Sequence, residues 1–580
     1  MSKLVVDQQS IKELFSNKKV DFLIPDYQRP YAWGDDECET LWDDIFEFAF
    51  PNNDYSAFDT DDEYFLGPIV TFKNDDGKLE IIDGQQRLTT LMLLLRAFYS
   101  HFGSMQDPNS ISTREDIAKC IWKTDEFGHP NTDKLKIDSE VSTDETKDEF
   151  LSILKTGKTS NGQKSKYAKN YRFFEGKISD FLNHFPTYFA YLPNRIMNNC
   201  ILLPIEAESQ DTALRIFSTL NDRGKPLADT DIFKAQFYKY YSDLGKKEDF
   251  ILRWKNLESL CDEIFPSVNG SPMDELFTRY MYYERARMGI RLTTTEALRK
   301  FYERNKYEIL KREQTLNDLE ILAEFWKEVS DQDDAIFSDR ILRRLFVLYY
   351  APNSMWTYLV SVYFMANKTD DNTLEEEAFY EFLNRITAFI FAYALVHPGV
   401  NALRTPTYPE MINIVNGKRV EFQNYKLDRS AIKNALDNFA FTNGRPITKS
   451  MLAWWAFENN SQTLIDVNMR MEIEHIYPRK RQENEYGLSD PSNLETLGNK
   501  ALLEKNINIR ASDYRFRDKK KYYTGFITDS GKKKEGTANA ELRGLTVRND
   551  FTEDDIVERT HRINKSFLHY LKENDVLDEE

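Results

Sequence analysis

Residues 79–95, LEIIDGQQRLTTLMLLL, constrain the fold most because a strand, a turn and a helix are predicted within one short stretch. The apolar run 79–82 predicts a strand that enters a core. Asp83 and Gly84 predict a turn, since glycine tolerates backbone angles that other residues avoid. The next apolar residues recur at helical spacing and predict one buried face: Leu88, Leu91, Met92, Leu95 and Phe98.

The polar side chains of this turn, Gln85, Gln86 and Arg87, lie where the predicted helix begins. Free backbone N–H groups and the helix dipole favour an anion at that position. Arg87 can bind a phosphate with two hydrogen bonds, and the two amides can hydrogen-bond a base or a sugar. The segment alone fits equally well a polar turn that caps a core helix.

Two further polar clusters share this composition. They are Tyr27-Gln28-Arg29 and residues 221–224, Asn-Asp-Arg-Gly, and each places an arginine beside amides or carboxylates at the edge of a predicted element. A nucleotide site needs arginine for phosphate, an acid for a metal or water, and amides for base and ribose. A structural ion-pair centre explains any one cluster, whereas the three together favour a nucleotide site.

Length and composition limit the class of protein. A chain of 580 residues is too long for one core and predicts two to four domains, and 41% hydrophobic and 14% aromatic content is typical of a globular protein. The longest apolar runs, 92–95 and 389–396, are shorter than the ~18 residues of a membrane span. The four cysteines are scattered without a CxxC pair. We therefore expect a reduced cytoplasmic protein without a membrane span or a structural zinc cluster.

Charge argues against a protein that coats nucleic acid uniformly, because the net charge is −18. A local basic patch is sufficient for DNA binding, and one occurs in residues 479–534, which contain 14 Lys and Arg residues but only eight Asp and Glu residues. An ordinary solvated surface is the alternative explanation of this patch.

A second chemical centre is predicted near the C-terminus. The sequence MEIEHIYP at 471–478 predicts a strand with Glu474 on one face and His475 on the other, and residues 497–503 predict a second strand. Asn506, Asn508 and a polar helix at 512–523 follow. Strand, strand and helix, with His first and Asn later, match the ββα-metal nuclease fold of the HNH class. In that chemistry a neutral His takes a proton from water while a divalent metal stabilises the phosphorane.

The N-terminal segments YQRPYAW, FLGPIVTF, IIDGQQRLTTL and IFSTLNDRGKPLADTDIFKAQF resemble the ParB-like domain of the GmrSD family of modification-dependent restriction endonucleases. The resemblance implies nucleoside triphosphate binding and hydrolysis, with Asp83 as a catalytic residue. It implies the following nucleotide-binding residues: Gln28, Arg29, Asp83, Gly84, Gln85, Gln86, Arg87, Asn221 and Arg223. In relatives that sense phosphorothioated DNA, the tyrosine of YQR helps to form the sensing pocket, which makes Tyr27 a candidate DNA contact.

The C-terminal residues resemble the HNH domain of the same family, through Glu474 to Pro478, Gly498-Asn499, and Asn508 with Phe516 and Lys520. The resemblance implies that His475 is the general base, that Glu474 and Asn508 bind the metal, and that Asn499 belongs to the catalytic set by orienting the loop. Asn506 is the alternative to Asn508, but the spacing from Asn499 favours Asn508. Lys500 stands where relatives have an apolar residue, which predicts a less buried second strand. The basic residues of the last helix are predicted to contact the DNA backbone: Arg515, Arg517, Lys519, Lys520 and Lys521.

These observations predict an α+β multidomain protein. Its parts are a ParB-like α/β domain at 1–240, a helical connector at 241–425 and a ββα-metal HNH nuclease domain at 426–580. The predicted function is a nucleotide-regulated, modification-dependent DNA endonuclease of type IV restriction and anti-phage defence. It would use a nucleoside triphosphate and a divalent metal (Mg²⁺ first, Mn²⁺ or Ca²⁺ otherwise), act on modified phage DNA, and form a homodimer if it nicks both strands. The alternatives are a nucleotide-switched DNA-binding protein that does not cut, and a nuclease that acts on RNA.

Overall fold

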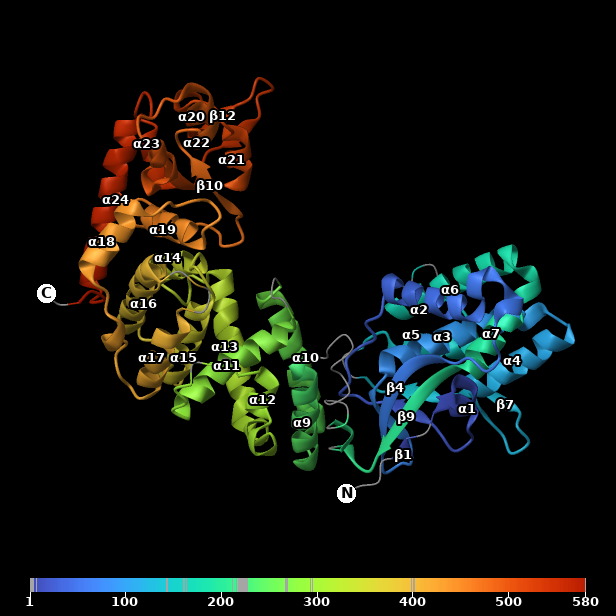
Figure 1. Cartoon of the computed structure of the whole chain (residues 1–580). Helices are drawn as coiled ribbons and strands as arrows, with labels where there is room; N and C mark the ends of the chain where they lie inside the picture. The colour runs from blue at the N-terminus through green and yellow to red at the C-terminus, as the bar shows by residue number, and fades with distance from the viewer. Residues whose placement is uncertain are drawn as a thin grey trace. The chain divides into compact units, whose positions relative to one another are not determined.

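The computed structural model describes the chain except residues 1–4, 7, 142–143, 160–161, 163, 211, 215, 217–227, 267–269, 293, 295, 398, 400–401 and 579–580. The chain forms two compact units, Met1–Lys255 and Asn256–Glu580. The predicted α+β multidomain class is confirmed, because one unit contains a large mixed sheet and the other is mainly helical with small antiparallel ribbons (Figure 1).

The first unit is built on a mixed sheet with the order β1-β9-β4-β5-β3-β8, and β2 also pairs with β9. β4 runs parallel to β9, and β5 and β8 run parallel to β3, whereas β4 and β5 form an antiparallel pair. The strands are β1 (Val5–Val6), β2 (Gln9–Ser10), β3 (Phe22–Ile24), β4 (Tyr64–Lys73), β5 (Leu79–Asp83), β8 (Ile137–Ser139) and β9 (Cys200–Ala207). A small separate ribbon contains β6 (Trp122–Thr124) and β7 (Pro130–Leu135).

The predicted strand–turn–helix is confirmed. β5 ends at Asp83, Gly84 adopts a left-handed conformation with φ 93°, and helix α3 covers Gln85–His101. A hairpin precedes it, and in the turn between β4 and β5 Gly77 donates its N–H to Asn74 O at 2.9 Å.

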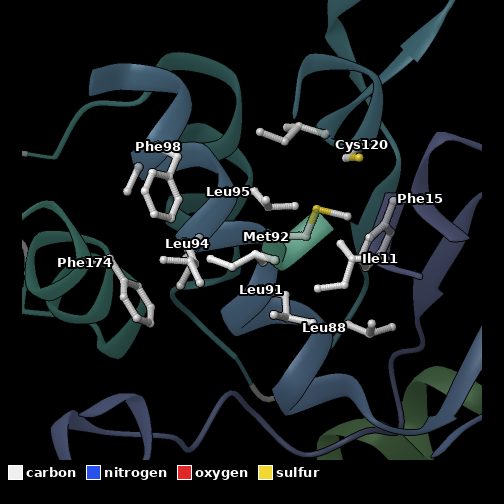
Figure 2. Packing of buried hydrophobic residues seen from close by; sticks show 14 of the residues in the cluster. Ile11, Phe15, Leu88, Leu91, Met92, Leu94, Leu95, Phe98, Cys120 and Phe174 are labelled. Carbon is white, nitrogen blue, oxygen red and sulfur yellow. The ribbon is translucent and has the colours of Figure 1, made fainter. Parts of the chain in front are cut away.

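Helix α3 lies in the centre of the first unit's core. Its predicted apolar face is buried, and Leu93, Leu94 and Ala97 on its other sides are buried as well. Figure 2 shows Leu88, Leu91 and Met92 near Ile11 and Phe15, and Leu94 on the side of Phe174. Because every side of α3 is packed, the position of its first turn is fixed by the core.

The remaining helices of the first unit surround this core. They are α1 (Ile11–Ser16), α2 (Asp35–Ala49), α4 (Pro108–Ile121), α5 (Lys147–Thr156), α6 (Lys166–His184), α7 (Tyr191–Asn199) and α9 (Asp229–Asp243). Helix α10 (Lys247–Ile264) continues from the first unit into the second.

The second unit begins with a helical region, as the sequence predicts for the connector. Its helices are α11 (Pro272–Arg287), α12 (Leu298–Tyr302), α13 (Glu313–Asp331), α14 (Asp339–Tyr349), α15 (Met355–Asn367), α16 (Glu376–Val396), α17 (Arg404–Val415), α18 (Arg429–Asn438) and α19 (Pro446–Phe457). By length and composition α16 could cross a membrane, but 72% of its apolar window is buried inside the protein. The apolar composition of α16 is therefore explained by its packing in the protein core.

The C-terminal part contains the antiparallel pair β10 (Met471–His475) and β11 (Lys500–Glu504). Around it lie α20 (Arg479–Glu485), α21 (Lys505–Ala511), α22 (Phe516–Thr524), β12 (Gly525–Ile527), β13 (Lys533–Glu535), α23 (Ala540–Leu545) and α24 (Glu553–Glu573). Two boundaries differ from the prediction. The second strand begins only at Lys500, because residues 497–499 form a 3₁₀ turn. The helix predicted at 512–523 is α22, which begins at Phe516, and a further helix, α21, precedes it.

Candidate functional site

Asp83, at the end of β5, is the acidic residue of the first candidate site. Burial raises the pKa of Asp83, while the N–H of Gly84 and the positive charges of Arg87 and Arg29 lower it. Arg87 is largely buried, which lowers its pKa, and its Nη1 donates to Pro68 O at 3.0 Å. A carboxylate and two guanidinium groups therefore influence one another at the start of α3.

Gly67 makes room for the Arg87 guanidinium. Its φ is 118°, and a Cβ at this position would lie 2.9 Å from Arg87 Nη2. The glycine of the FLGP segment and the arginine of the DGQQR segment thus form one structural element, although they come from different strands and turns. Two separate segments of the sequence therefore meet at this site.

The glutamines of the site bind the protein's own backbone. Gln28 Nε2 donates to Ile81 O and Ile82 O, both at 3.1 Å. Gln86 Oε1 accepts from Ala32 N at 2.6 Å, and its Nε2 donates to Pro30 O. Gln85 Nε2 donates to Arg29 O at 2.9 Å. In the described structure these amides connect the loop after β3 to the β5–α3 turn. Whether they also contact a base or a sugar is not tested and stays a prediction.

One polar atom of this cluster remains without a partner. Gln85 Oε1 is buried and accepts no hydrogen bond in the described structure. Helix α3 also begins without a side-chain cap, because Gly84 offers none. The start of α3 therefore leaves both an amide oxygen and backbone N–H groups for a ligand.

Tyr27 does not lie at the protein surface. Its side chain is 5% exposed, its hydroxyl donates to Glu80 Oε2 at 3.2 Å, and its ring lies 4.9 Å from that of Tyr238 on α9. This position differs from the surface expected of a DNA contact, because the ring belongs to a small hydrophobic cluster of the sheet. Arg29 is half-buried near Asp83, and Asn221 and Arg223 lie outside the described residues.

His475, at the end of β10, is the centre of the second candidate site. Its side chain is 12% exposed, and its Nε2 lies 3.6 Å from Glu495 Oε1, too far for a hydrogen bond. Burial, followed by the positive charge of Lys500, lowers the pKa of His475 to about 4, although Glu495 opposes this shift. The imidazole is therefore neutral at pH 7, as a general base must be.

Glu495 was missed by the sequence reasoning. It accepts from Lys500 Nζ at 2.6 Å and from Arg479 Nη2 at 2.9 Å while it lies beside the His475 ring. Lys500 is fully buried, so the expectation of a less buried second strand is wrong. The reason is that Lys500 Nζ also donates to Phe441 O and Asn443 Oδ1, which satisfies its charge inside the protein.

Glu474 points away from His475 into a buried ion pair. Lys519 Nζ of α22 lies 2.7 Å from Glu474 Oε1 and 2.7 Å from His475 O, and Tyr523 donates its hydroxyl to the same Glu474 oxygen. The side chains of Lys519 and Glu474 are 1% and 4% exposed. Burial raises the pKa of Glu474, and Lys519 opposes this shift. Lys519 therefore holds the end of β10 and does not lie at the surface, which corrects its predicted exposure to DNA.

A divalent metal at Glu474 and Asn508 does not fit this arrangement. The charge of Glu474 is already balanced by Lys519, and a second cation beside that ammonium would be repelled. Asn508 is half-buried on α21. Among the described residues, no group of three or more His, Cys, Asp or Glu side chains comes together as a metal site. The arrangement therefore does not support the predicted metal role of Glu474, whereas the role of Asn508 and the choice between Asn506 and Asn508 stay predictions.

Asn499 holds the loop that follows His475. Its Oδ1 accepts from Tyr477 N at 2.7 Å, and its Nδ2 donates to Tyr477 O and Leu494 O, both at 3.1 Å. The side chain is completely buried. All three contacts are to backbone atoms, so Asn499 positions the loop beside His475.

Helix α24 fastens the Gly-Asn turn from its other side. Arg559 donates to Leu497 O, Gly498 O and Lys500 O, and it forms a buried pair with Glu541 at 2.8 Å. A Cβ at Gly498 would overlap with the carbonyl of Ile556 and the hydroxyl of Thr560 on the same helix. Glycine is therefore required because α24 lies directly against the turn.

The basic side chains of α22 have different positions. Arg515, Arg517 and Lys521 are exposed, and Arg515 pairs with Glu485 at 2.6 Å. Lys520 is half-buried and donates to Arg548 O at 2.8 Å. The exposed members are the ones that remain accessible to a phosphate backbone.

Comparison with known proteins matches both candidate sites to one family. Residues 11–238 match the GmrSD restriction endonuclease, N-terminal domain, and residues 427–566 match the GmrSD restriction endonucleases, C-terminal domain. The chain belongs to the GmrSD restriction endonuclease family. No curated protein matches the chain.

The two GmrSD matches contain the two sites separately. The N-terminal match includes Asp83, Arg87 and the loop that the glutamines fasten, and the C-terminal match includes His475, Glu495 and most of α24. Residues 239–426 lie outside both matches. The GmrSD architecture therefore assigns a restriction endonuclease, with type IV restriction and antiviral defence as its setting.

Proposed function

We propose that the protein is a nucleotide-regulated, modification-dependent DNA endonuclease that cleaves phosphodiester bonds at His475. The observation that carries this proposal is a neutral imidazole whose buried Nε2 has no hydrogen-bond partner among the described residues, within a GmrSD C-terminal domain. A neutral ring nitrogen without a partner can accept a proton, which a general base requires.

The neighbours of His475 support this chemistry. Lys519 holds its backbone carbonyl, and Asn499 holds the next residues, so the ring is presented by a rigid strand end. When Nε2 takes a proton from water, the Glu495 carboxylate beside it stabilises the imidazolium. The proton moves from water to Nε2, and the hydroxide that results attacks phosphorus. The P–O bond to one sugar oxygen then breaks, and this leaving oxygen takes up a proton from solvent, while Nε2 later releases its own proton to solvent.

The nucleotide would bind at the start of α3. Its uncapped N–H groups and the Arg87 and Arg29 guanidinium groups suit the phosphates, and Gln85 Oε1 offers an acceptor to a ligand donor. Asp83 would orient the water that attacks the terminal phosphate, since it lies among these cations. Hydrolysis at this site would regulate the nuclease.

Three further parts of the proposal rest on the family or on surface charge. GmrSD-type nucleases generally use a divalent metal, although no group of three or more His, Cys, Asp or Glu side chains comes together among the described residues. DNA would contact the exposed Arg515, Arg517 and Lys521, and Lys520 at their edge. Modified phage DNA is the proposed substrate, and a homodimer would place two nuclease sites on opposite strands.

The test uses purified full-length protein and a panel of modified and plain DNAs, with and without each nucleoside triphosphate and with EDTA. His475→Ala should reduce cleavage by about 10²–10⁴-fold while nucleotide hydrolysis continues. His569→Ala is the matched control, because His569 is an exposed residue of α24 paired with Glu573. Undiminished cutting by His475→Ala would refute the assignment. An RNA substrate in the same panel tests the alternative that the protein is a nuclease acting on RNA.

A further inference from the structure

A cavity of about 330 Å³ lies in the second unit. Most of its wall comes from helical residues outside both family matches, and Val467 and Asn468 of the C-terminal match complete it. Its volume is at the lower end of the ~300–1,000 Å³ of small-molecule sites. Much of its wall is formed by the buried Arg279 of α11 and by aromatic side chains: Phe265, Trp326, Phe346, Tyr349 and Trp356. Tyr349 is 59% exposed and marks the opening to solvent, whereas Trp326 and Phe346 are buried.

Arg279 is held rigidly but incompletely hydrogen-bonded. Its guanidinium carbon lies 4.0 Å from the Trp326 ring centroid and 4.4 Å from that of Phe265, and its Nε donates to Glu275 at 2.9 Å. Its Nη1 is buried and has no hydrogen-bond partner in the described structure. A buried donor of this kind is unfavourable unless a ligand supplies an acceptor.

The aromatic walls are also fixed in place. Trp326 Nε1 donates to Ser361 Oγ at 2.9 Å, and the Trp326 and Trp356 rings lie 5.7 Å apart at 66°. Rigid aromatic faces bind flat rings by stacking, which is how proteins hold unpaired nucleobases.

The charge of the cavity favours a neutral ring over a phosphate. Glu275 already balances the charge of Arg279, and the wall itself contains an acid, Glu263. What remains is Arg279 Nη1, whose two N–H groups have no partner among the described residues and can donate to two adjacent acceptors such as O6 and N7 of guanine.

We propose that the cavity at Arg279 binds a purine-type base that presents two adjacent hydrogen-bond acceptors, with its ring against the tryptophan faces. The base can come from a free nucleoside or from a nucleotide that is turned out of a DNA strand. This site is separate from the start of α3 and from His475, and it does not depend on the function proposed for either.

Binding is measured by calorimetry on the full-length protein with guanosine, inosine and adenosine, none of which carries a phosphate. Guanosine and inosine should bind at least tenfold more tightly than adenosine, because the 6-amino group of adenosine is a donor that faces Arg279. Equal affinity for all three nucleosides, or no affinity for guanosine and for the DNA described below, overturns the proposal.

Two variants locate the binding. Val467→Trp places a large side chain in the cavity wall at a half-buried position and should weaken guanosine binding at least tenfold, and Tyr349→Ala should weaken it through loss of an exposed ring. Phe127→Trp, at a highly exposed position of the first unit, is the matched control and should change nothing. Thermal melting shows that each variant is folded, and unchanged binding by folded Val467→Trp would place the ligand elsewhere and refute the site.

Two hairpin DNAs distinguish a base turned out of a DNA strand from a free nucleoside. One hairpin carries a single unpaired guanine, and the other is fully paired. Preference for the unpaired guanine that is lost in Val467→Trp identifies a base from DNA, whereas binding of guanosine alone identifies a free nucleoside. The proposal is contradicted if the protein binds both hairpins equally, if Val467→Trp does not change this binding, and if guanosine does not bind.

Discussion

The two candidate sites are held together by different interactions. At the start of α3, neutral amides bind backbone groups, as Gln28 and Gln86 do. Around His475, buried ion pairs position the strand and the turn, as in Glu474–Lys519 and Glu541–Arg559. The first arrangement consists of several weak hydrogen bonds. The second depends on buried charges, and removing the partner of a buried charge strongly lowers the free energy of unfolding.

This difference suits the two proposed tasks. A site that binds and releases a nucleotide benefits from contacts that can be exchanged, because each amide hydrogen bond contributes only about 1 kcal/mol. A general base must keep its position, and buried pairs on both sides of β10 and β11 provide that rigidity. Single substitutions should therefore have larger effects on stability in the second site than in the first.

The largest effect is expected for Lys519→Met, which leaves the Glu474 carboxylate buried without its counter-charge. The free energy of unfolding should fall by about 3–5 kcal/mol, measured by urea denaturation of the full chain. Lys521→Met on the same helix is the control and should change stability by less than about 0.5 kcal/mol, because Lys521 is exposed. The double variant Lys519→Met/Glu474→Gln should recover part of the loss, and a small effect of Lys519→Met would contradict the role of the buried pair.

The next largest effect is expected for Gly498→Ala. The added methyl group overlaps with Ile556 O and Thr560 of α24, so the turn must move away from the helix. We expect a loss of about 1–3 kcal/mol together with reduced cleavage, because Asn499 and Lys500 move with the turn. Gly544→Ala in α23 is the control, since a Cβ there meets no atom within 4 Å. Normal stability of Gly498→Ala would show that α24 does not constrain the turn.

In the first unit, Gln86→Leu should lower stability by about 1–3 kcal/mol, because Ala32 N and Trp33 N lose their acceptor. Hydrogen exchange of the loop before α2 should increase, while exchange in the α3 core stays slow. Gln106→Leu, at an exposed position of the same unit, is the control. If Gln86→Leu destabilises more than Lys519→Met, the contrast between the two sites is wrong.

The smallest effect concerns Glu553 at the surface end of α24. Hydrogen bonds from Asp490 N, Asn493 Nδ2 and Ser489 N lower the pKa of Glu553 to about 2, from an ordinary 4.5. Because the folded pKa is depressed, the stabilisation is present above pH 4.5 and is lost as the pH falls towards 2. Glu553→Gln should lower the Tm at neutral pH, and the difference from the unchanged protein should vanish near pH 2. Glu558→Gln on the same helix should show no such pH dependence.

The strand–turn–helix at 79–95 could be predicted because its signals are local. Apolar spacing, a glycine at a positive φ and the polar turn all lie within one stretch. The burial of α3 on every side could not be predicted in this way, because it depends on α1, α4 and α6 around it. The sequence pattern identified one face, and the tertiary structure covered the others.

The roles of the lysines were the least predictable part of the candidate site. Lys500 is buried because Glu495, Asn443 and Phe441 O surround its ammonium, and two of these three partners lie more than fifty positions away in the chain. For Lys519 a local signal did exist. Phe516, Lys519 and Tyr523 share the buried face of α22, so the helical spacing separates Lys519 from its exposed neighbours.

The close fit of Gly67 against Arg87 has a consequence for how sequences of this kind can diverge. The space that a side chain at position 67 would need is occupied by the guanidinium, so the two positions share one volume. A substitution at either one changes what the other can tolerate. We therefore expect positions 67 and 87 to vary together among related chains. A relative with a larger residue at 67 will have lost the arginine at 87 and will also have a different backbone conformation at 67, because a φ of 118° disfavours any side chain.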